Sequence, residues 1–211
     1  MRAAHEGPQN SPQQLCRSRV EFRLRLWNDN DLRPLKRRPL SANTGDLEMA
    51  AFDGVAVSIV STEAQLWRLL PLMRSYCDFY GVEPPDDALL LLSRSLMADP
   101  AHEGVQFIAT EGVADLGFAT LFWSWETTIA GRVGVMNDLF VAGASRGRGI
   151  GSALIAACLE RCRHHGAVRM IWQTAVDNLA AQAVYAHVGA TRESWVDYWL
   201  DTGAAGLLER H

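Results

Sequence analysis

Three closely spaced glycines occur where a predicted strand turns into a predicted helix. Gly147, Gly149 and Gly151 belong to the segment 139–152, which reads LFVAGASRGRGIGS. Glycine has no Cβ, so the backbone can approach a ligand closely and present successive N–H groups to it. The start of a helix adds partial positive charge, and Arg146 and Arg148 add charge-assisted donors. The segment therefore predicts a cradle for a phosphate or pyrophosphate.

Two common phosphate-binding motifs do not fit this segment. A Walker A loop requires Gly-Lys-Ser/Thr, but the single lysine of the chain is Lys36. A dinucleotide fingerprint requires glycine where the chain has Ser152, and it opens a βαβ unit rather than following an antiparallel meander. The predicted ligand is therefore a phosphate compound of another class.

A second pattern lies downstream, at Asn178-x-x-Ala181-x-x-x-Tyr185 followed by Gly189. Seven residues make about two helical turns, so Asn178 and Tyr185 share one helix face, and Ala181 between them leaves room for a ligand. Taken alone, Tyr185 would more often be a core residue. The glycine turn upstream favours a functional interpretation.

Together these two patterns resemble the GNAT superfamily of N-acetyltransferases, over the element order from 55 to 200. The family's Arg/Gln-x-x-Gly-x-Gly/Ala turn, which holds the pyrophosphate of coenzyme A, is matched by Arg146, Gly149 and Gly151. Gly143 departs from the family, because many members have proline there. The resemblance implies acetyl-CoA as cosubstrate and the following coenzyme-binding residues: Leu139, Phe140, Val141, Arg146, Gly147, Arg148, Gly149, Ile150, Gly151, Ser152 and Asn178.

The resemblance also implies a reaction, namely direct attack of a primary amine of a small molecule on the thioester in a ternary complex. Tyr185 matches the family's general acid, and a tyrosine of pKa about 10 can protonate a leaving thiolate of comparable basicity. A backbone N–H near 139–141 is expected to bond the thioester oxygen. Two rival functions stay open: a catalytically silent acetyl-CoA-binding module, and a protein or peptide N-acetyltransferase.

The amine must lose a proton, and two carboxylates are candidates for the base. Asp138 precedes the coenzyme strand end, and Glu126 lies on the neighbouring strand. The stretch 137–152 looks most like the diamine (spermidine/spermine-type) acetyltransferase branch, which has Glu-Asp where this chain has Asn137-Asp138. The family carboxylate is therefore missing at 137; Asp138 is retained as the first candidate for the base, and the identity of the base stays open.

Other reactive or aromatic side chains have two interpretations each. Trp123 and Trp125 share a strand face and either wall a cation-binding acceptor pocket or belong to the core. Cys158 and Cys162 fall at i, i+4 on an apolar helix face, which favours buried thiols over metal ligands. We therefore expect no metal.

Periodicity predicts an α/β (α+β) order of elements with antiparallel N-terminal strands. The resemblance implies the GNAT fold, with a mixed central sheet, a splayed strand pair and flanking helices. Pro71 is expected to split the first helix, and Gly189 to end the last. The predicted strands are 55–59, 105–110, 116–127, 132–141, 168–174 and 195–200, and the predicted helices are 63–80, 86–97, 150–164 and 178–187.

Composition divides the 211 residues into a tail and one domain. Residues 1–48 hold nine Arg/Lys and six Asp/Glu, a net +3, and lack a core pattern, so a disordered tail is expected. Residues 49–211 hold eleven Arg/Lys and eighteen Asp/Glu, a net charge of −7. This charge opposes nucleic-acid binding and favours cationic small molecules. No apolar run approaches the roughly 18 residues of a membrane span. A cytoplasmic enzyme without membrane or nucleic-acid partners is expected, and a homodimer is left open.

Overall fold

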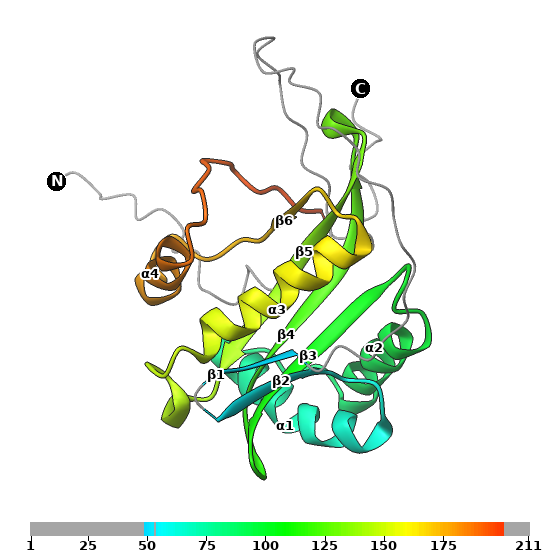
Figure 1. The fold of residues 1–211 in the computed structure, drawn as a ribbon, viewed down its shortest axis with the longest axis vertical. Coiled ribbons are helices and arrows are strands. Elements are labelled where there is room, and N and C mark those ends of the chain that lie inside the picture. The colour runs from blue at the N-terminus through cyan, green and yellow to red at the C-terminus, as the bar shows by residue number, and fades with distance from the viewer. Residues whose placement is uncertain (1–48, 53, 201–211) are drawn as a thin grey trace, which may run out of the picture.

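The fold is built on one six-stranded sheet, seen in a computed structural model that describes residues 49–52 and 54–200 (Figure 1). The predicted tail, 1–48, lies outside the described residues. Neighbouring strands follow chain order; the first four pairings are antiparallel and the last is parallel, so the sheet is mixed as predicted. The strands are β1 (Met49–Phe52), β2 (Val55–Ile59), β3 (Gly104–Glu111), β4 (Ala114–Glu126), β5 (Gly131–Val141) and β6 (Arg169–Ile171).

Helices cover both faces of the sheet. One apolar cluster lies under α3 and a second under α1 and α2, so these helices occupy opposite faces (Figure 1). No helix in the described ranges is long and apolar enough to cross a membrane. The helices are α1 (Glu63–Phe79), α2 (Asp86–Ala98), α3 (Ile150–His165) and α4 (Leu179–His187).

Helix α1 is continuous, so the predicted break at Pro71 is wrong. A capping box starts the helix, with Thr62 accepting from the backbone N–H of Gln65. Proline removes the bond to the carbonyl four residues earlier, which belongs to Trp67. Pro71 and Trp67 are both exposed, so water can bind that carbonyl while the buried face of α1 stays packed.

Strand β5 carries the two irregularities that shape the site. Against β4, Thr120 pairs with Asp138 and Leu121 with Met136, so Asn137 is an extra residue in a β-bulge. On its other side, β5 pairs with β6 only through 133–135. Beyond Val135, the side of β5 that faces away from β4 has no strand beside it among the described residues. This is the predicted splay.

The C-terminal part departs from prediction. The predicted buried strand 168–174 is shortened to β6 and is only half-buried, and 195–200 is not a strand. Residues 195–200, WVDYWL, are predicted as the last strand, but a strand needs a partner's backbone, and β6 is too short to offer one along the splay. At the other end, β1 was missed because it is four residues long and joined to β2 by a tight turn at Gly54.

Candidate active site

The glycine turn has the open geometry that the sequence predicts. After β5 the chain forms a short 3-10 turn, η3 (Gly143–Ser145), and then enters α3. Gly147 and Gly149 have φ of +76° and +78°, a region that disfavours residues with a Cβ. No heavy atom lies within 4 Å of where a Cβ would stand at either residue. Both glycines therefore combine a left-handed backbone with open space beside it.

The start of α3 offers backbone donors to this space. Gly149 is the N-cap and has no side chain to cap the helix, and the N–H of Ala153 is bonded to the Gly149 carbonyl at 3.0 Å. The N–H groups of residues 150–152 have no acceptor within the helix. Ile150 is buried and fixes the helix start in the core, whereas Ser152 is half-buried. This end of α3 can therefore bind an anion.

The two arginines of the turn are held differently. Arg146 donates from Nε to the Val141 carbonyl at 3.1 Å, which anchors its guanidinium beside the turn with further donors on the terminal nitrogens. Arg148 donates from Nη2 to Glu111 at 2.6 Å, and both side chains are about 41% exposed. An exposed pair of this kind contributes at most about 1 kcal/mol, so Glu111 opposes a phosphate only weakly.

The open edge of β5 presents backbone rather than side chains. Leu139 and Val141 pack toward the α3 cluster, and Phe140 is buried in the cluster under α1 and α2. Between Met136 and Val141, the backbone groups that point away from β4 have no strand opposite them in the described part of the chain. An extended chain with amide groups can bind there as an added strand would.

Helix α4 lies beside this edge and brings Tyr185 with it. A Cβ at Gly151 would lie 3.8 Å from Val184 and 3.9 Å from Val141, so α4, α3 and β5 converge at the turn. Tyr185 is half-buried and meets the ring of Trp172 edge-on at 5.3 Å. No residue of α4 is fully buried, so the helix packs on the rest of the domain through partly buried side chains only.

Asn178 already has a structural use. Its Oδ1 accepts from the N–H of Ala181 at 3.2 Å, which makes it the N-cap of α4. An asparagine at this position is therefore explained without a ligand, although its amide nitrogen and the second lone pair of Oδ1 can still contact a coenzyme.

The bulge turns Asn137 and Asp138 to the same face. Met136 and Leu139 pack toward α3, so the two residues between them face the α1 and α2 side. Asn137 donates from Nδ2 to Oδ1 of Asp138 at 3.0 Å. Asp138 and the α3-side residue Tyr185 thus belong to opposite sides of the open edge.

Glu126, the other candidate base, lies elsewhere. It pairs with Gly131 at the far end of β4, six residues from Thr120, or roughly 20 Å of strand. Its carboxylate accepts from Thr128 at 2.8 Å and contacts Arg169 at 3.5 Å. The structure therefore does not bring Glu126 to the glycine turn.

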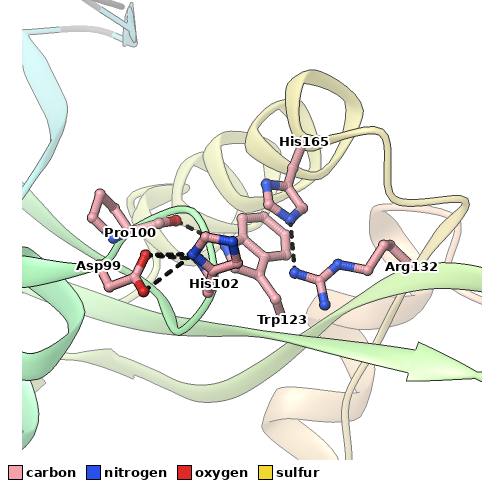
Figure 2. A network of polar contacts seen from close by, with 6 residues as sticks. All are labelled: Asp99, Pro100, His102, Trp123, Arg132 and His165. Carbon is pink, nitrogen blue, oxygen red and sulfur yellow. Dashed lines mark hydrogen bonds and ion pairs between the residues drawn. The ribbon is translucent and has the colours of Figure 1, made fainter.

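Trp123 and Trp125 lie at that far end as well. Trp123 is buried, stacks on His165 and donates from its indole nitrogen to the Pro100 carbonyl at 2.9 Å (Figure 2). Trp125 is 59% exposed beneath the guanidinium of Arg132. Neither lies beside Asp138, so the core interpretation holds for Trp123.

Cys158 and Cys162 are buried thiols, as the sequence suggested. Burial raises the pKa of Cys162 to about 11 and raises the pKa of Cys158 further. Both stay protonated at neutral pH and are poor nucleophiles.

The sequence between residues 69 and 190 matches the acetyltransferase (GNAT) family. The chain belongs to this family. A relative in Bacillus subtilis (strain 168), described as the uncharacterized N-acetyltransferase YhfO, is 27% identical over 137 residues, which cover 64% of this chain and 91% of that protein. The enzyme is therefore an acyl-CoA-dependent N-acyltransferase of the GNAT type, and the predicted family is confirmed.

Solved structures agree with this assignment. A probable acetyltransferase superposes with a TM-score of 0.60 and 27% identity, covering 71% of this chain and 98% of that one. The aminoglycoside N-acetyltransferase AAC(6')-Iy, in complex with CoA, superposes with a TM-score of 0.62 and 21% identity. The match covers 70% of this chain and 95% of that one. The predicted fold class is thereby confirmed.

Proposed function

We propose that this enzyme transfers acetyl from acetyl-CoA to a primary amine of a small molecule, by direct attack in a ternary complex. The observation that supports it most is the open edge of β5, which runs from the bulge at Asn137 to the glycine turn. Tyr185 belongs to the α3 side of this edge and Asp138 to the opposite side. A donor and an acceptor of protons thus flank the place where an acyl group would lie.

Each part of the edge has one task in this proposal. The N-terminus of α3, Arg146 and the glycines hold the pyrophosphate. The backbone of residues 139–141 pairs with the pantetheine amides and orients the thioester carbonyl. Tyr185 gives its phenol proton to the departing sulfur, and Asp138 takes the proton that the attacking nitrogen loses.

Charge and aromatic rings favour a cationic acceptor. The body of the chain is acidic, with eleven Arg/Lys against eighteen Asp/Glu over residues 49–211. On the face of Asp138, Tyr76 of α1 packs edge-on against Phe118 and Phe140, at 5.8 and 6.2 Å between ring centroids. Phe118 and Phe140 are buried, so the half-buried Tyr76 is the ring of this cluster that an ammonium group beside Asp138 could meet. Because Asn137 replaces the branch's carboxylate, the proposal does not extend to polyamine specificity.

A screen tests the proposal directly. Acetyl-CoA is incubated with polyamines, aminoglycosides, amino-acid amides and short peptides, and release of free thiol is measured. We expect turnover with at least one small amine. Turnover with peptides alone would favour the protein acetyltransferase alternative, and binding of acetyl-CoA by calorimetry without turnover on any amine would favour a silent module.

A further inference from the structure

A row of buried polar side chains crosses the sheet on the α1 and α2 side and ends at Asp138. The strand register places Gln106 of β3 opposite Thr120 of β4, and Thr120 opposite Asp138 of β5. Gln106 is 2% exposed and Thr120 is 0% exposed. Gln106 donates from Nε2 to the Thr120 hydroxyl oxygen at 3.2 Å. The row thus leads from the core to the predicted base.

Packing alone does not explain these residue types. Apart from Ser93, the other buried side chains on this face are apolar or contain sulfur, and a buried polar group costs about 1–3 kcal/mol unless it is bonded. The Oε1 atom of Gln106 is buried with no hydrogen-bond partner among the described residues. A buried polar group in this state calls for an explanation.

The contacts fix which way the hydroxyl of Thr120 points. The Nε2 atom of Gln106 lies 3.6 Å from the sulfur of Met73, which can only accept, so the amide nitrogen belongs on this side. Because the Thr120 oxygen accepts from Gln106, its own hydrogen must point elsewhere. The next side chain across the sheet is Asp138, and directly opposed Cβ atoms lie about 4.5–5.5 Å apart.

We propose that Thr120, oriented by Gln106, is a positioning residue that holds the Asp138 carboxylate for proton transfer from the acceptor amine. Asn137 donates to Oδ1 of the same carboxylate, and Thr120 would add a further donor to that carboxylate. Hydrogen bonds of this kind often become short only when substrate is bound. The inference rests on the proposed function, because it gives Asp138 the role of base.

Thr120→Val removes the hydroxyl and keeps the shape, and Thr120→Ser keeps the hydroxyl. We expect Thr120→Val to lower kcat/KM for the amine roughly tenfold, within the range of one hydrogen bond to a charged group. The acid limb of the pH profile should move to higher pH, because a carboxylate with fewer donors binds a proton more readily. Affinity for acetyl-CoA should not change, and Thr120→Ser should stay within about threefold of wild type.

Ser93→Ala is the matched control. Ser93 is equally buried on this face, and its hydroxyl bonds to the Leu89 carbonyl and to Met73, not to β5. Its substitution should lower stability without moving the pH profile. A Thr120→Val enzyme that loses stability but keeps the wild-type pH profile, as Ser93→Ala should, would overturn the inference. If Thr120→Val does not fold, Thr120→Cys takes its place in the same comparison.

The double variant Thr120→Val/Asp138→Asn separates this inference from the proposed function. If Thr120 acts through Asp138, its substitution should add no further loss in the Asp138→Asn background. Independent losses would refute the positioning role but leave Asp138 as base. A wild-type rate for Asp138→Asn itself would remove the base proposed above, and the inference with it.

Discussion

The two ends of β5 differ in where their polar groups find partners. At the closed end, where β5 begins, polar side chains bind other side chains or, for Trp123, the backbone carbonyl of Pro100 (Figure 2). Trp123 and His165 stack with centroids 3.7 Å apart and planes 6° from parallel, and Arg132 reaches Nε2 of His165 at 3.4 Å. At the open end, past Met136, the strand edge and the helix start offer backbone donors that face no strand or capping side chain in the described part of the chain.

This difference separates stability from function. Groups that satisfy one another contribute to folding and leave nothing for a ligand. Backbone groups that the fold positions but does not hydrogen-bond are available for binding a ligand. The positive-φ glycines leave open space through which a ligand can approach them. Substitutions at the open end should therefore change rate or affinity at nearly constant stability, and substitutions at the closed end should do the reverse.

The largest effect is expected for Tyr185→Phe, which removes one hydroxyl and keeps the ring against Trp172. If Tyr185 protonates the leaving thiolate, the single-turnover rate should fall about 10²-fold or more. Melting temperature and acetyl-CoA affinity should change little. Rapid-quench measurement of one turnover, with a thermal melt of the same sample, gives both quantities.

Tyr198→Phe is the control for this change, because Tyr198 is strongly exposed in the segment after α4. It should behave as wild type in both measurements. A Tyr185→Phe enzyme with a normal rate and a lowered melting temperature would show that Tyr185 is only a core residue.

Gly149→Asp should have the next largest effect, on coenzyme affinity. The change places a negative charge where the pyrophosphate is expected, and we predict at least a tenfold weaker Kd for acetyl-CoA, or about 1.4 kcal/mol, by calorimetry. Gly149→Asn is the matched control, since asparagine has nearly the same size and both residues tolerate the left-handed backbone found here.

Comparison of these two variants separates the effect of side-chain charge on acetyl-CoA affinity from the effect of backbone strain. Gly149→Asn should lose less affinity than Gly149→Asp, and both should fold. Equal losses would mean that the backbone conformation alone matters, and no loss in either variant would contradict the assignment of the turn to coenzyme.

The sequence indicates those parts of the candidate site that depend on local chemistry. Glycines at a strand-to-helix junction and an Asn178–Tyr185 spacing can be interpreted residue by residue. The face of Asp138 could not be predicted, because it depends on the bulge at Asn137, and a bulge leaves no regular period in the sequence. Gln106 gave a weak signal that was missed: an amide within an apolar strand.

Errors in the fold have the same origin. Residues 195–200 are predicted as a strand, yet a strand also requires a neighbour, and that depends on how far β6 continues beside β5. Pro71 was judged by its local cost, but the packed face of α1 outweighs one missing bond. Local propensity therefore located the elements, and tertiary contacts decided where they end.

The smallest effect should appear at the closed end and only in stability. Burial lowers the pKa of His165, and the charges of Arg132 and Arg161 lower it further. The unfolded chain then binds a proton at His165 more readily than the folded protein, so stability should fall as pH drops below the ordinary histidine value of about 6.5.

His165→Asn keeps a planar acceptor for Arg132 but cannot be protonated. Between pH 7.5 and 5.5 its melting temperature should fall by a few degrees less than that of wild type. His164→Gln is the control, because His164 is exposed in the last turn of the same helix; it should follow wild type. Acetyl-CoA affinity should be unchanged in both variants, and a loss of affinity in His165→Asn would show that the two ends of β5 are not independent.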